Sequence, residues 1–494
     1  MRLRNIRPVY VAVGVAVVAY LATSGGAALI PFKFGQDQLR LFFFPRAIQF
    51  EWMTTLGRPI YWLLFLLTIV VLPVAAIVTE KGMGSVTLLF PELPLWIPLL
   101  LAGAMIAFCV FKLAQAGGLS ASEAWDPRLC YEDKILRRVE LFRLLGNRYY
   151  SFVYSSLPII GCYLLARGLI GREMASIVAF IVVSSIILWL DVATIQKAPP
   201  LLYVLVIGLT LMLSGFGLVR STIVTVGVGG AIYLVLALNQ FCTAETNSRN
   251  LRAIAMSLDV ARQATSLQPP LGAPELPGPV APARSPAAAS SPSNPPSIQS
   301  DGTAAAERDG MIDKGIWLLR SAVFRMAVSF PYYVQIFADP AQRCGVVLPP
   351  LGSLVAPRPC YPGTKVFPVM YPEVKYTTGS QPAGVSLSGY AEAGPPYAVL
   401  ATVIAGVFIG LLSAVARGTD PASVVLQVVC CLYAYYVTQV PLAGTLLDSY
   451  GLFWLVAPIA AMCVMKWMAG IALSIGGAGY VRHSPQGNSP SPDL

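Results

Sequence analysis

The sequence contains a single histidine among its 494 residues, His483, which lies in a polar stretch rich in serine and proline. Zinc sites of the HExxH type and the two-histidine triad of non-heme iron enzymes therefore lack their ligands. We expect no metal and no cofactor. Any catalyst in this chain has to work with carboxylates, arginine, lysine and tyrosine.

Charged residues are also scarce, at 12% of the chain, while 56% of the residues are hydrophobic. Soluble domains carry about 25% charged residues, so the composition excludes a soluble enzyme. The net charge is +10, but the basic residues stand between long apolar runs and not in one stripe. This distribution argues against a nucleic-acid partner and favours a lipid bilayer.

Ten apolar segments satisfy the requirement of about 20 apolar residues per bilayer-crossing helix. They lie at approximately 9–30, 60–79, 94–114, 150–168, 174–191, 201–219, 221–241, 397–416, 422–442 and 451–475. The first is too long for a signal peptide and lacks a cleavage site, so we interpret it as a retained helix. The sequence predicts an all-α polytopic integral membrane protein of about 10–11 transmembrane helices with one large periplasmic loop.

An eleventh span could run from Gly315 to Phe337, although Arg320 and Arg325 would lie where hydrocarbon penalises charge. The distribution of lysine and arginine over the short loops favours eleven spans with the N-terminus outside, because cytoplasmic loops carry the excess. With either ten or eleven spans, residues 339–396 are predicted to face the periplasm of a bacterial inner (plasma) membrane, and the C-terminus the cytoplasm.

The chain divides by composition into five parts. Residues 1–264 hold the N-terminal transmembrane helices, and residues 265–310, rich in proline, alanine and serine, are predicted to be a disordered linker. Residues 311–396 hold the arginine-containing segment and the large periplasmic loop. Residues 397–475 hold the C-terminal transmembrane helices, and residues 476–494 form a disordered tail.

The large loop intersperses prolines with tyrosines and charged residues, a pattern typical of an ordered, irregular lid. Its two cysteines, Cys344 and Cys360, either form a disulfide, which an oxidising compartment would maintain, or remain as two thiols. Aromatic and charged side chains together suit sugar stacking and phosphate binding. On these grounds the candidate substrate-binding residues of the loop are Arg343, Arg358, Lys375 and Tyr390.

Glu392 and Arg325 are the strongest catalytic candidates. Glu392 lies five residues before an apolar span, where a carboxylate beside apolar groups can act as a general base or can merely orient an arginine. Arg325 and Arg320 stand in an apolar context, in which charges usually line a pathway or meet a partner. Arg220, at a junction of two spans, could bind phosphate oxygens with its planar fork or could be an ordinary interfacial arginine.

Three stretches resemble the bacterial oligosaccharide repeat-unit polymerases, the Wzy-type O-antigen and exopolysaccharide polymerases. They read LSGFGLVRSTIV around Arg220, LLRSAVFRMAVSFPYYVQIF around Arg325, and SGYAEAGPPYAVLATVIAGVFIG around Glu392. The third departs from the family, which often has Asn-Phe-Gly after the acid where this chain has Gly394-Pro395-Pro396. Within that last stretch, Gly406 and Gly410 have the GxxxG spacing that permits close helix packing.

The resemblance implies a GT-C-like helical bundle and a metal-independent glycosyltransferase. Such an enzyme transfers a glycan from polyprenyl diphosphate to the terminal sugar of another lipid-linked unit, in some cases with a chain-length regulator. Arginines would neutralise the diphosphate leaving group, and Glu392 would serve as the base. Two alternatives are a lipid-linked sugar flippase or secondary transporter and, less favoured, an O-antigen ligase, whose periplasmic histidine has no counterpart here. A structural envelope protein is a third.

Overall fold

The computed structural model describes residues 6–33, 57–84, 93–117, 131–194, 198–238, 326–346, 360–370, 381–448 and 450–477, with residues 35, 55, 196 and 324. These residues form helices and no strands. Seven of their helices are long and apolar enough to cross a membrane, which indicates a membrane-embedded α-helical protein. The predicted linker 265–310 and most of the predicted tail lie outside the described residues.

Each of the ten predicted apolar segments coincides with a helix. The seven long ones are Pro8–Ala28, Pro59–Gly82, Trp96–Gln115, Glu140–Gly171, Met174–Ala193, Pro395–Val415 and Leu442–Ile471. The three others are shorter apolar helices, Ala198–Leu213, Leu218–Tyr233 and Pro421–Val437. Hydropathy therefore located the helices correctly, and seven of them meet both the length and the hydropathy expected of a membrane span.

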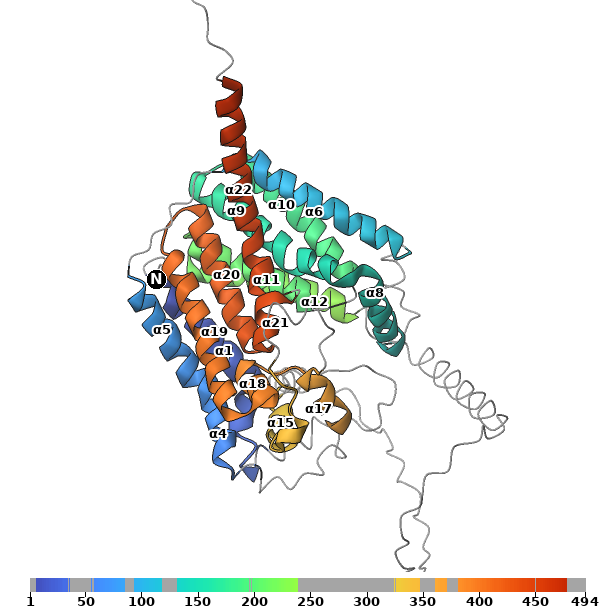
Figure 1. The fold of residues 1–494 in the computed structure, drawn as a ribbon. Helices are drawn as coiled ribbons and strands as arrows, with labels where there is room; N and C mark the ends of the chain where they lie inside the picture. The colour runs from blue at the N-terminus through green and yellow to red at the C-terminus, as the bar shows by residue number, and fades with distance from the viewer. Residues whose placement is uncertain are drawn as a thin grey trace, which may run out of the picture.

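A first group of helices comes from the N-terminal and C-terminal parts of the chain, and its members pack side by side (Figure 1). It consists of α1 (Pro8–Ser24), α4 (Pro59–Leu66), the π turn η4 (Leu67–Val71), α5 (Leu72–Gly82), α19 (Pro395–Val415) and α20 (Pro421–Val437). The helix α1 continues into a short 3-10 turn, η2 (Gly25–Ala28). The three elements α4, η4 and α5 follow one another without a break.

The closest approach within this group is between α5 and α19. A Cβ atom added to Gly406 would lie 2.7 Å from the Ala75 Cβ, and one added to Gly410 would lie 2.5 Å from the Ala76 carbonyl oxygen. Any larger residue at either position would push the helices apart. The GxxxG spacing of the sequence therefore does serve close helix packing.

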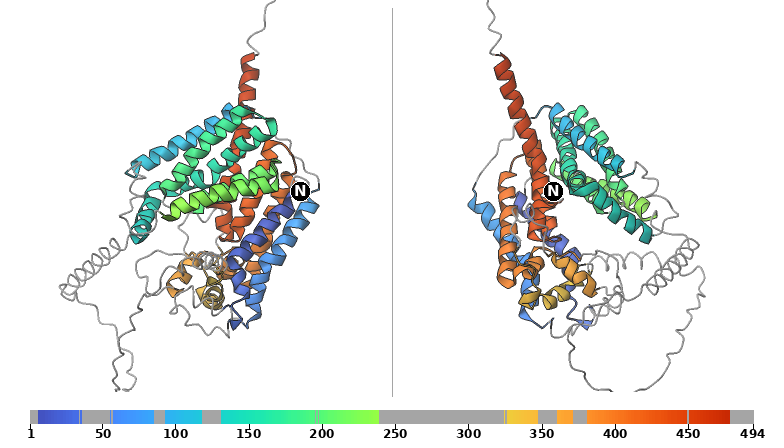
Figure 2. Two further views of the ribbon diagram at one scale, coloured as in Figure 1. Left: turned by 180° about the vertical axis from the view of Figure 1, so that it is seen from behind. Right: turned by 45° about the vertical axis from the view of Figure 1, so that its right-hand side comes forward.

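A second group of helices comes from the middle of the chain and packs beside the first (Figures 1 and 2). It consists of α6 (Trp96–Gln115), α8 (Tyr131–Ser151), the π turn η5 (Phe152–Ser156), α9 (Leu157–Gly171), α10 (Met174–Ala193), α11 (Ala198–Leu213) and α12 (Leu218–Leu238). Both α9 and α11 contact α20. The last helix, α22 (Leu452–Gly477), follows α21 (Leu442–Leu447) and contacts α20 as well as α6 and α9.

Three short helices gather at the end of the first group where α4 and α19 begin, and we call them the cap (Figure 1). They are α15 (Ser329–Ile336), α17 (Pro362–Met370) and α18 (Val385–Ala393). Their apolar side chains join those of α4 in one buried cluster that includes Phe65, Phe330, Phe337 and Tyr390. A buried hydrogen bond between the Thr68 and Ser386 hydroxyls, 3.0 Å long, ties α18 to η4.

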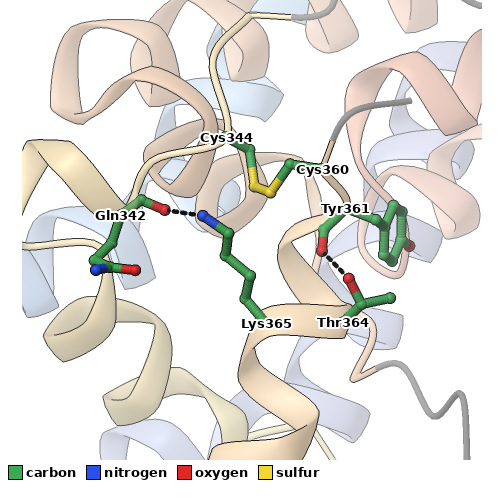
Figure 3. The surroundings of a disulfide bond; sticks show 6 residues. All are labelled: Gln342, Cys344, Cys360, Tyr361, Thr364 and Lys365. Atoms are coloured by element: carbon green, nitrogen blue, oxygen red, sulfur yellow. Dashed lines mark hydrogen bonds between the residues drawn. A yellow bond between two sulfur atoms is a disulfide. The ribbon is translucent and has the colours of Figure 1, made fainter. Parts of the chain in front are cut away.

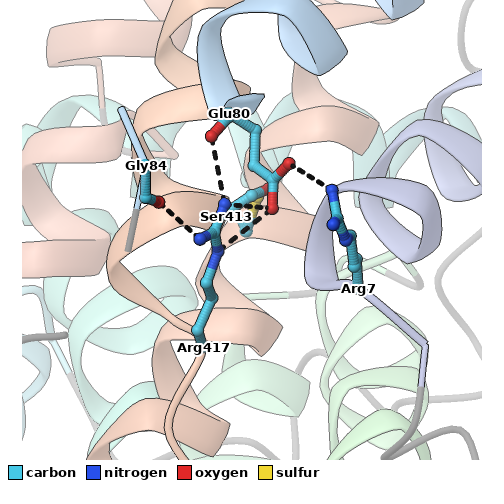
Figure 4. A network of polar contacts seen from close by, with 6 residues as sticks. Arg7, Glu80, Gly84, Ser413 and Arg417 are labelled. Atoms are coloured by element: carbon cyan, nitrogen blue, oxygen red, sulfur yellow. Dashed lines mark hydrogen bonds and ion pairs between the residues drawn. The ribbon is translucent and has the colours of Figure 1, made fainter. Parts of the chain in front are cut away.

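A buried ion-pair network marks the opposite end of this group (Figure 4). Glu80, near the end of α5, is fully buried, and its Oε1 accepts hydrogen bonds from Arg417 Nη2 at 2.6 Å and Nε at 3.1 Å. Arg7, directly before α1, has its Nη1 atom 3.6 Å from the Glu80 Oε2. The start of α1, the end of α5 and the end of α19 therefore share one end of the bundle.

This network corrects the interpretation with eleven spans, which put Arg7 and Arg417 on opposite sides of the membrane. Eight apolar helices separate these two residues, an even number, and a crossing by Gly315–Phe337 would make nine. The described part of that segment, residues 324 and 326–337, contains only the eight-residue helix α15, which is buried in the cap. The two arginines on one carboxylate place Arg7 and Arg417 on the same side of the membrane.

We predict that cysteines introduced at Met83 and Thr419 react with a membrane-impermeant maleimide from the same side, and one at Asp339 from the other side. All three positions are exposed at the ends of the bundle. The measurement is a mass-tag shift in sealed vesicles of each orientation, with the unsubstituted chain as the control for native cysteines. Labelling of Met83 and Thr419 from opposite faces would contradict this prediction and support the interpretation with eleven spans.

Candidate functional site

The candidate site is built around the turn that connects the cap to the membrane helices. Gly394 ends α18 and begins α19 with φ 89° and ψ −170°, a conformation that favours glycine. Pro395 then occupies the first position of α19, where no backbone N–H is needed. A Cβ at residue 394 would also lie 2.8 Å from Arg343 Nη1. The Gly-Pro-Pro sequence is thus a compact turn that lets a guanidinium lie against the backbone.

The segment that carries Arg343 is bound to α18 through the backbone. The Cys344 N–H donates to the Ala391 carbonyl oxygen at 3.0 Å, and the Gly345 N–H donates to that of Glu392 at 2.9 Å. Carbonyl groups in the last turn of a helix otherwise lack partners. These two bonds therefore complete the end of α18 and fix Arg343 beside it.

A disulfide fastens the same segment to α17 (Figure 3). Cys344 and Cys360, with Cα atoms 5.2 Å apart, form the pair that the sequence left open. Nearby, the Lys365 ammonium donates to the Gln342 carbonyl oxygen at 2.7 Å. The part of the predicted lid that the structure describes is accordingly an ordered element of the cap.

Arg343 and Tyr390 face one another in this cap. The Arg343 Nε donates to the Phe337 carbonyl oxygen at 3.2 Å, and its guanidinium carbon lies 5.9 Å from the centre of the Tyr390 ring. Burial raises the pKa of Tyr390 above its ordinary value, while the guanidiniums of Arg343 and Arg58 act in the opposite direction. The Tyr390 hydroxyl therefore stays protonated at neutral pH, and two positive charges stand close to it.

Glu392 lies in the last turn of α18 and is 7% exposed. Its carboxylate interacts electrostatically with Tyr333 of α15 and with Tyr397 of α19. The pKa of Tyr333 is raised well above its ordinary value, first by burial and then by Tyr361 and Glu392. A buried carboxylate among neutral tyrosines, with Arg343 and Arg58 close to Tyr390 of the same short helix, is an arrangement that can bind an anion and accept a proton side by side.

The structure brings together three of the predicted residues, Glu392, Arg343 and Tyr390, and separates one. Arg220 is exposed near the start of α12, seven residues after Leu213. Leu213 lines a pocket together with Arg7 and Arg417, at the end of the bundle opposite to Glu392. Arg220 therefore lies on the chain close to the end of the bundle opposite to Arg343, and its role as a diphosphate ligand stays a prediction.

Four predicted residues, Arg320, Arg325, Arg358 and Lys375, lie outside the described residues. The neighbours of Arg325 are described: Phe324 belongs to the same apolar cluster as Tyr390, and the Met326 N–H donates to the Thr23 carbonyl oxygen at 2.9 Å. Among the described residues, no group of three or more potential ligands could hold a metal ion.

Sequence reasoning missed Arg58 and Asp191. Arg58 precedes Pro59 at the start of α4, and its position at the mouth of a span beside the predicted loop was an available signal. Asp191 is the acid inside the apolar segment 174–191, and it is 1% exposed with its Oδ1 atom lacking a hydrogen-bond partner. An acid in a membrane span is itself a functional signal, which the search for arginines passed over.

No family model, no curated protein and no solved structure matches this chain.

We predict that the Cys344–Cys360 bridge stabilises the cap. Replacing both residues by serine should lower the free energy of unfolding by about 3 kcal/mol, the chain-entropy value for a loop of about 15 residues. The measurement is thermal unfolding in detergent, with and without a reductant. The reductant should destabilise the wild type and the control Cys463→Ser equally, and should leave the double variant unchanged. A wild type insensitive to complete reduction would contradict the prediction.

Proposed function

We propose that the protein is a polymerase of lipid-linked oligosaccharide repeat units, working at the periplasmic face of the bacterial inner membrane. The observation that carries the proposal is the cap, in which Glu392, Arg343 and Tyr390 are held together at the end of apolar helices. A lipid-linked sugar diphosphate presents its reacting atoms at this depth, because its chain lies in the bilayer and its diphosphate in the interface. The sequence resemblance supports the same assignment.

In the proposed reaction, a hydroxyl oxygen of the acceptor sugar forms a bond to the anomeric carbon of the donor glycan. The bond from that carbon to the diphosphate oxygen breaks, and the lipid diphosphate leaves with the electron pair. Glu392 accepts the proton of the acceptor hydroxyl. Arg343, with Arg58 close to Tyr390, offsets the negative charge that develops on the leaving oxygen. Arg325, predicted for the same role, completes the proposed set.

The proposed role of each residue follows from its surroundings. The Arg343 guanidinium has its Nε fixed by a carbonyl oxygen, which leaves donors on its two terminal nitrogens to engage two oxygens of one phosphate. The Tyr390 hydroxyl donates to the Val334 carbonyl oxygen at 3.4 Å, and its oxygen can accept a hydrogen bond from a sugar hydroxyl. Glu392 is shielded from bulk water, which suits a transfer that must favour a sugar hydroxyl over hydrolysis.

We predict that Glu392→Gln lowers the rate of chain extension by roughly 100-fold or more, the usual contribution of a general base. The assay uses purified protein and a polyprenyl diphosphate-linked repeat unit, with products resolved by length. Arg343→Gln should reduce the rate by a similar factor, and Arg343→Lys should restore part of it, because the charge remains. The controls are Glu140→Gln and Arg143→Gln, two exposed positions on α8.

A base also leaves a signature in the pH profile. The wild-type rate should fall in acid as Glu392 becomes protonated, and this limb should be absent in the residual activity of Glu392→Gln. Thermal unfolding of each variant checks that the cap is intact. If folded Glu392→Gln extends chains at the wild-type rate, Glu392 is not the base. If the folded wild type forms no ladder with its own repeat unit, the polymerase proposal fails.

The buried Asp191 favours a second candidate, a carrier that moves lipid-linked sugars across the membrane. Its carboxyl group lies near the end of α10 and interacts electrostatically with Tyr154, Tyr203 and Tyr436, which come from three other elements. The Tyr436 hydroxyl likewise lacks a hydrogen-bond partner. Buried carboxyls in membrane spans mark proton relays in pumps and transporters.

We predict for this candidate that Asp191→Asn abolishes any pH-gradient-driven translocation of a fluorescent lipid-linked oligosaccharide in proteoliposomes. Glu392→Gln should leave that translocation unchanged, because Glu392 belongs to the cap. The exposed Asp339→Asn is the matched control. Translocation that is absent in the wild type, or present and unaffected in Asp191→Asn, would contradict the carrier proposal and leave Asp191 with a structural role only.

A further inference from the structure

A pocket of about 250 Å³ opens at the end of the bundle opposite to the cap. It is formed where α1 and α20 begin and where α11 and α19 end. Its lining includes Arg7, Pro8, Leu213, Arg417, Thr419 and Gln427. Because these apolar helices all terminate here, the pocket lies at the boundary between membrane and water, with no residue of the cap in its lining.

Positive charge exceeds negative charge on the pocket wall. Glu80 carries one carboxylate for two guanidiniums, and Arg417 makes the short contacts with it (Figure 4). Arg7 makes one contact of 3.6 Å, and 57% of its side chain is exposed. Arg7 therefore lines the pocket with a side chain that Glu80 holds at one nitrogen only.

Asp420, which follows the lining residue Thr419 in the chain, uses its carboxylate to cap its own helix. Its carboxylate accepts hydrogen bonds from the Ala422 and Ser423 N–H groups, each at 3.1 Å, and from the Ser423 hydroxyl at 2.5 Å. Asp420 thus caps α20 and directs its oxygens at the first turn of that helix. The charge that remains to be matched in the pocket is that of Arg7.

The size and the lining of the pocket indicate an organic anion. A water molecule takes about 30 Å³ of liquid volume, so this pocket is larger than a small inorganic ion needs. Pro8, Leu213 and Val424 supply apolar wall beside the guanidiniums. A phosphate ester with an attached apolar portion matches both kinds of wall, and arginine is the side chain best suited to phosphate oxygens.

We propose that this pocket binds the headgroup phosphate of an anionic phospholipid. Arg7 contacts the phosphate, Arg417 holds the wall in place through Glu80, and the apolar residues receive the start of the acyl region. The lipid, rather than a soluble phosphate ester, is favoured because the pocket lies where apolar helices end. The site is independent of the proposed polymerase activity.

The test measures the affinity of the purified full-length protein for a short-chain phosphatidylglycerol by native mass spectrometry. Phosphatidylcholine, which has the phosphate but no net charge, and inorganic phosphate are the comparison ligands. Arg7→Gln should weaken phosphatidylglycerol binding about fivefold, the equivalent of about 1 kcal/mol per basic residue near a membrane. Glu80→Gln should strengthen it, because it removes the opposing charge and keeps an acceptor for Arg417.

Arg172→Gln, an exposed arginine after α9 and not in the pocket lining, is the matched control and should change nothing. Arg7→Lys should retain most of the affinity. If Glu80→Gln does not fold, the comparison of Arg7→Gln with Arg7→Lys decides the question. Equal binding of phosphatidylglycerol and phosphatidylcholine, or unchanged binding in Arg7→Gln, would overturn the proposal. Complete displacement of the lipid by inorganic phosphate would overturn the assignment to a lipid.

Discussion

The contact between α5 and α19 is the interaction on which the rest of the structure depends. Gly406 and Gly410 let the two backbones touch, and Glu80 and Arg417 close the contact at one end. Inside a bilayer the hydrophobic effect does not drive helices together, because the lipid tails are as apolar as the helix surfaces. Close packing and interhelical polar bonds therefore have to hold the helices together. Breaking a buried ion pair leaves a charge without compensation, at a cost of about 3–5 kcal/mol, and this makes the pairing specific.

The helix α19 connects the two ends of the protein. It begins at the Gly394 turn beside Arg343 and ends two residues before Arg417, and its 21 residues span about 30 Å at 1.5 Å per residue. That length matches the hydrocarbon core of a bilayer. Two polar regions, the cap at one end and the arginine pocket at the other, therefore lie about one membrane thickness apart.

The sequence predicted what depends on local pattern and missed what depends on long-range pairing. Hydropathy placed all ten apolar helices, and the GxxxG spacing indicated the packing of α19. The pairing of Glu80 with Arg417 joins residues 337 positions apart, and nothing in the charge distribution reveals it. The loop count put Arg7 and Arg417 on opposite sides of the membrane for the same reason. Glu392 could be named as a candidate because it lies next to the Gly394-Pro395-Pro396 turn, which is visible in the sequence. Asp191 was missed because it stands among apolar residues.

The two candidate functions require different mechanical behaviour, and the cap suits only one of them. A carrier must let one group of helices move against another. Glu392 and Arg343 belong to a cap that contacts the first group through α4, η4 and α19 and is fastened by a disulfide. A site fastened in this way has a fixed geometry, which is what a glycosyl transfer needs. Asp191 belongs to the second group, which a carrier would have to move against the first. The proposed chemistry in the cap and the proposed carrier role of Asp191 therefore rest on different parts of the fold, and each can be tested without the other.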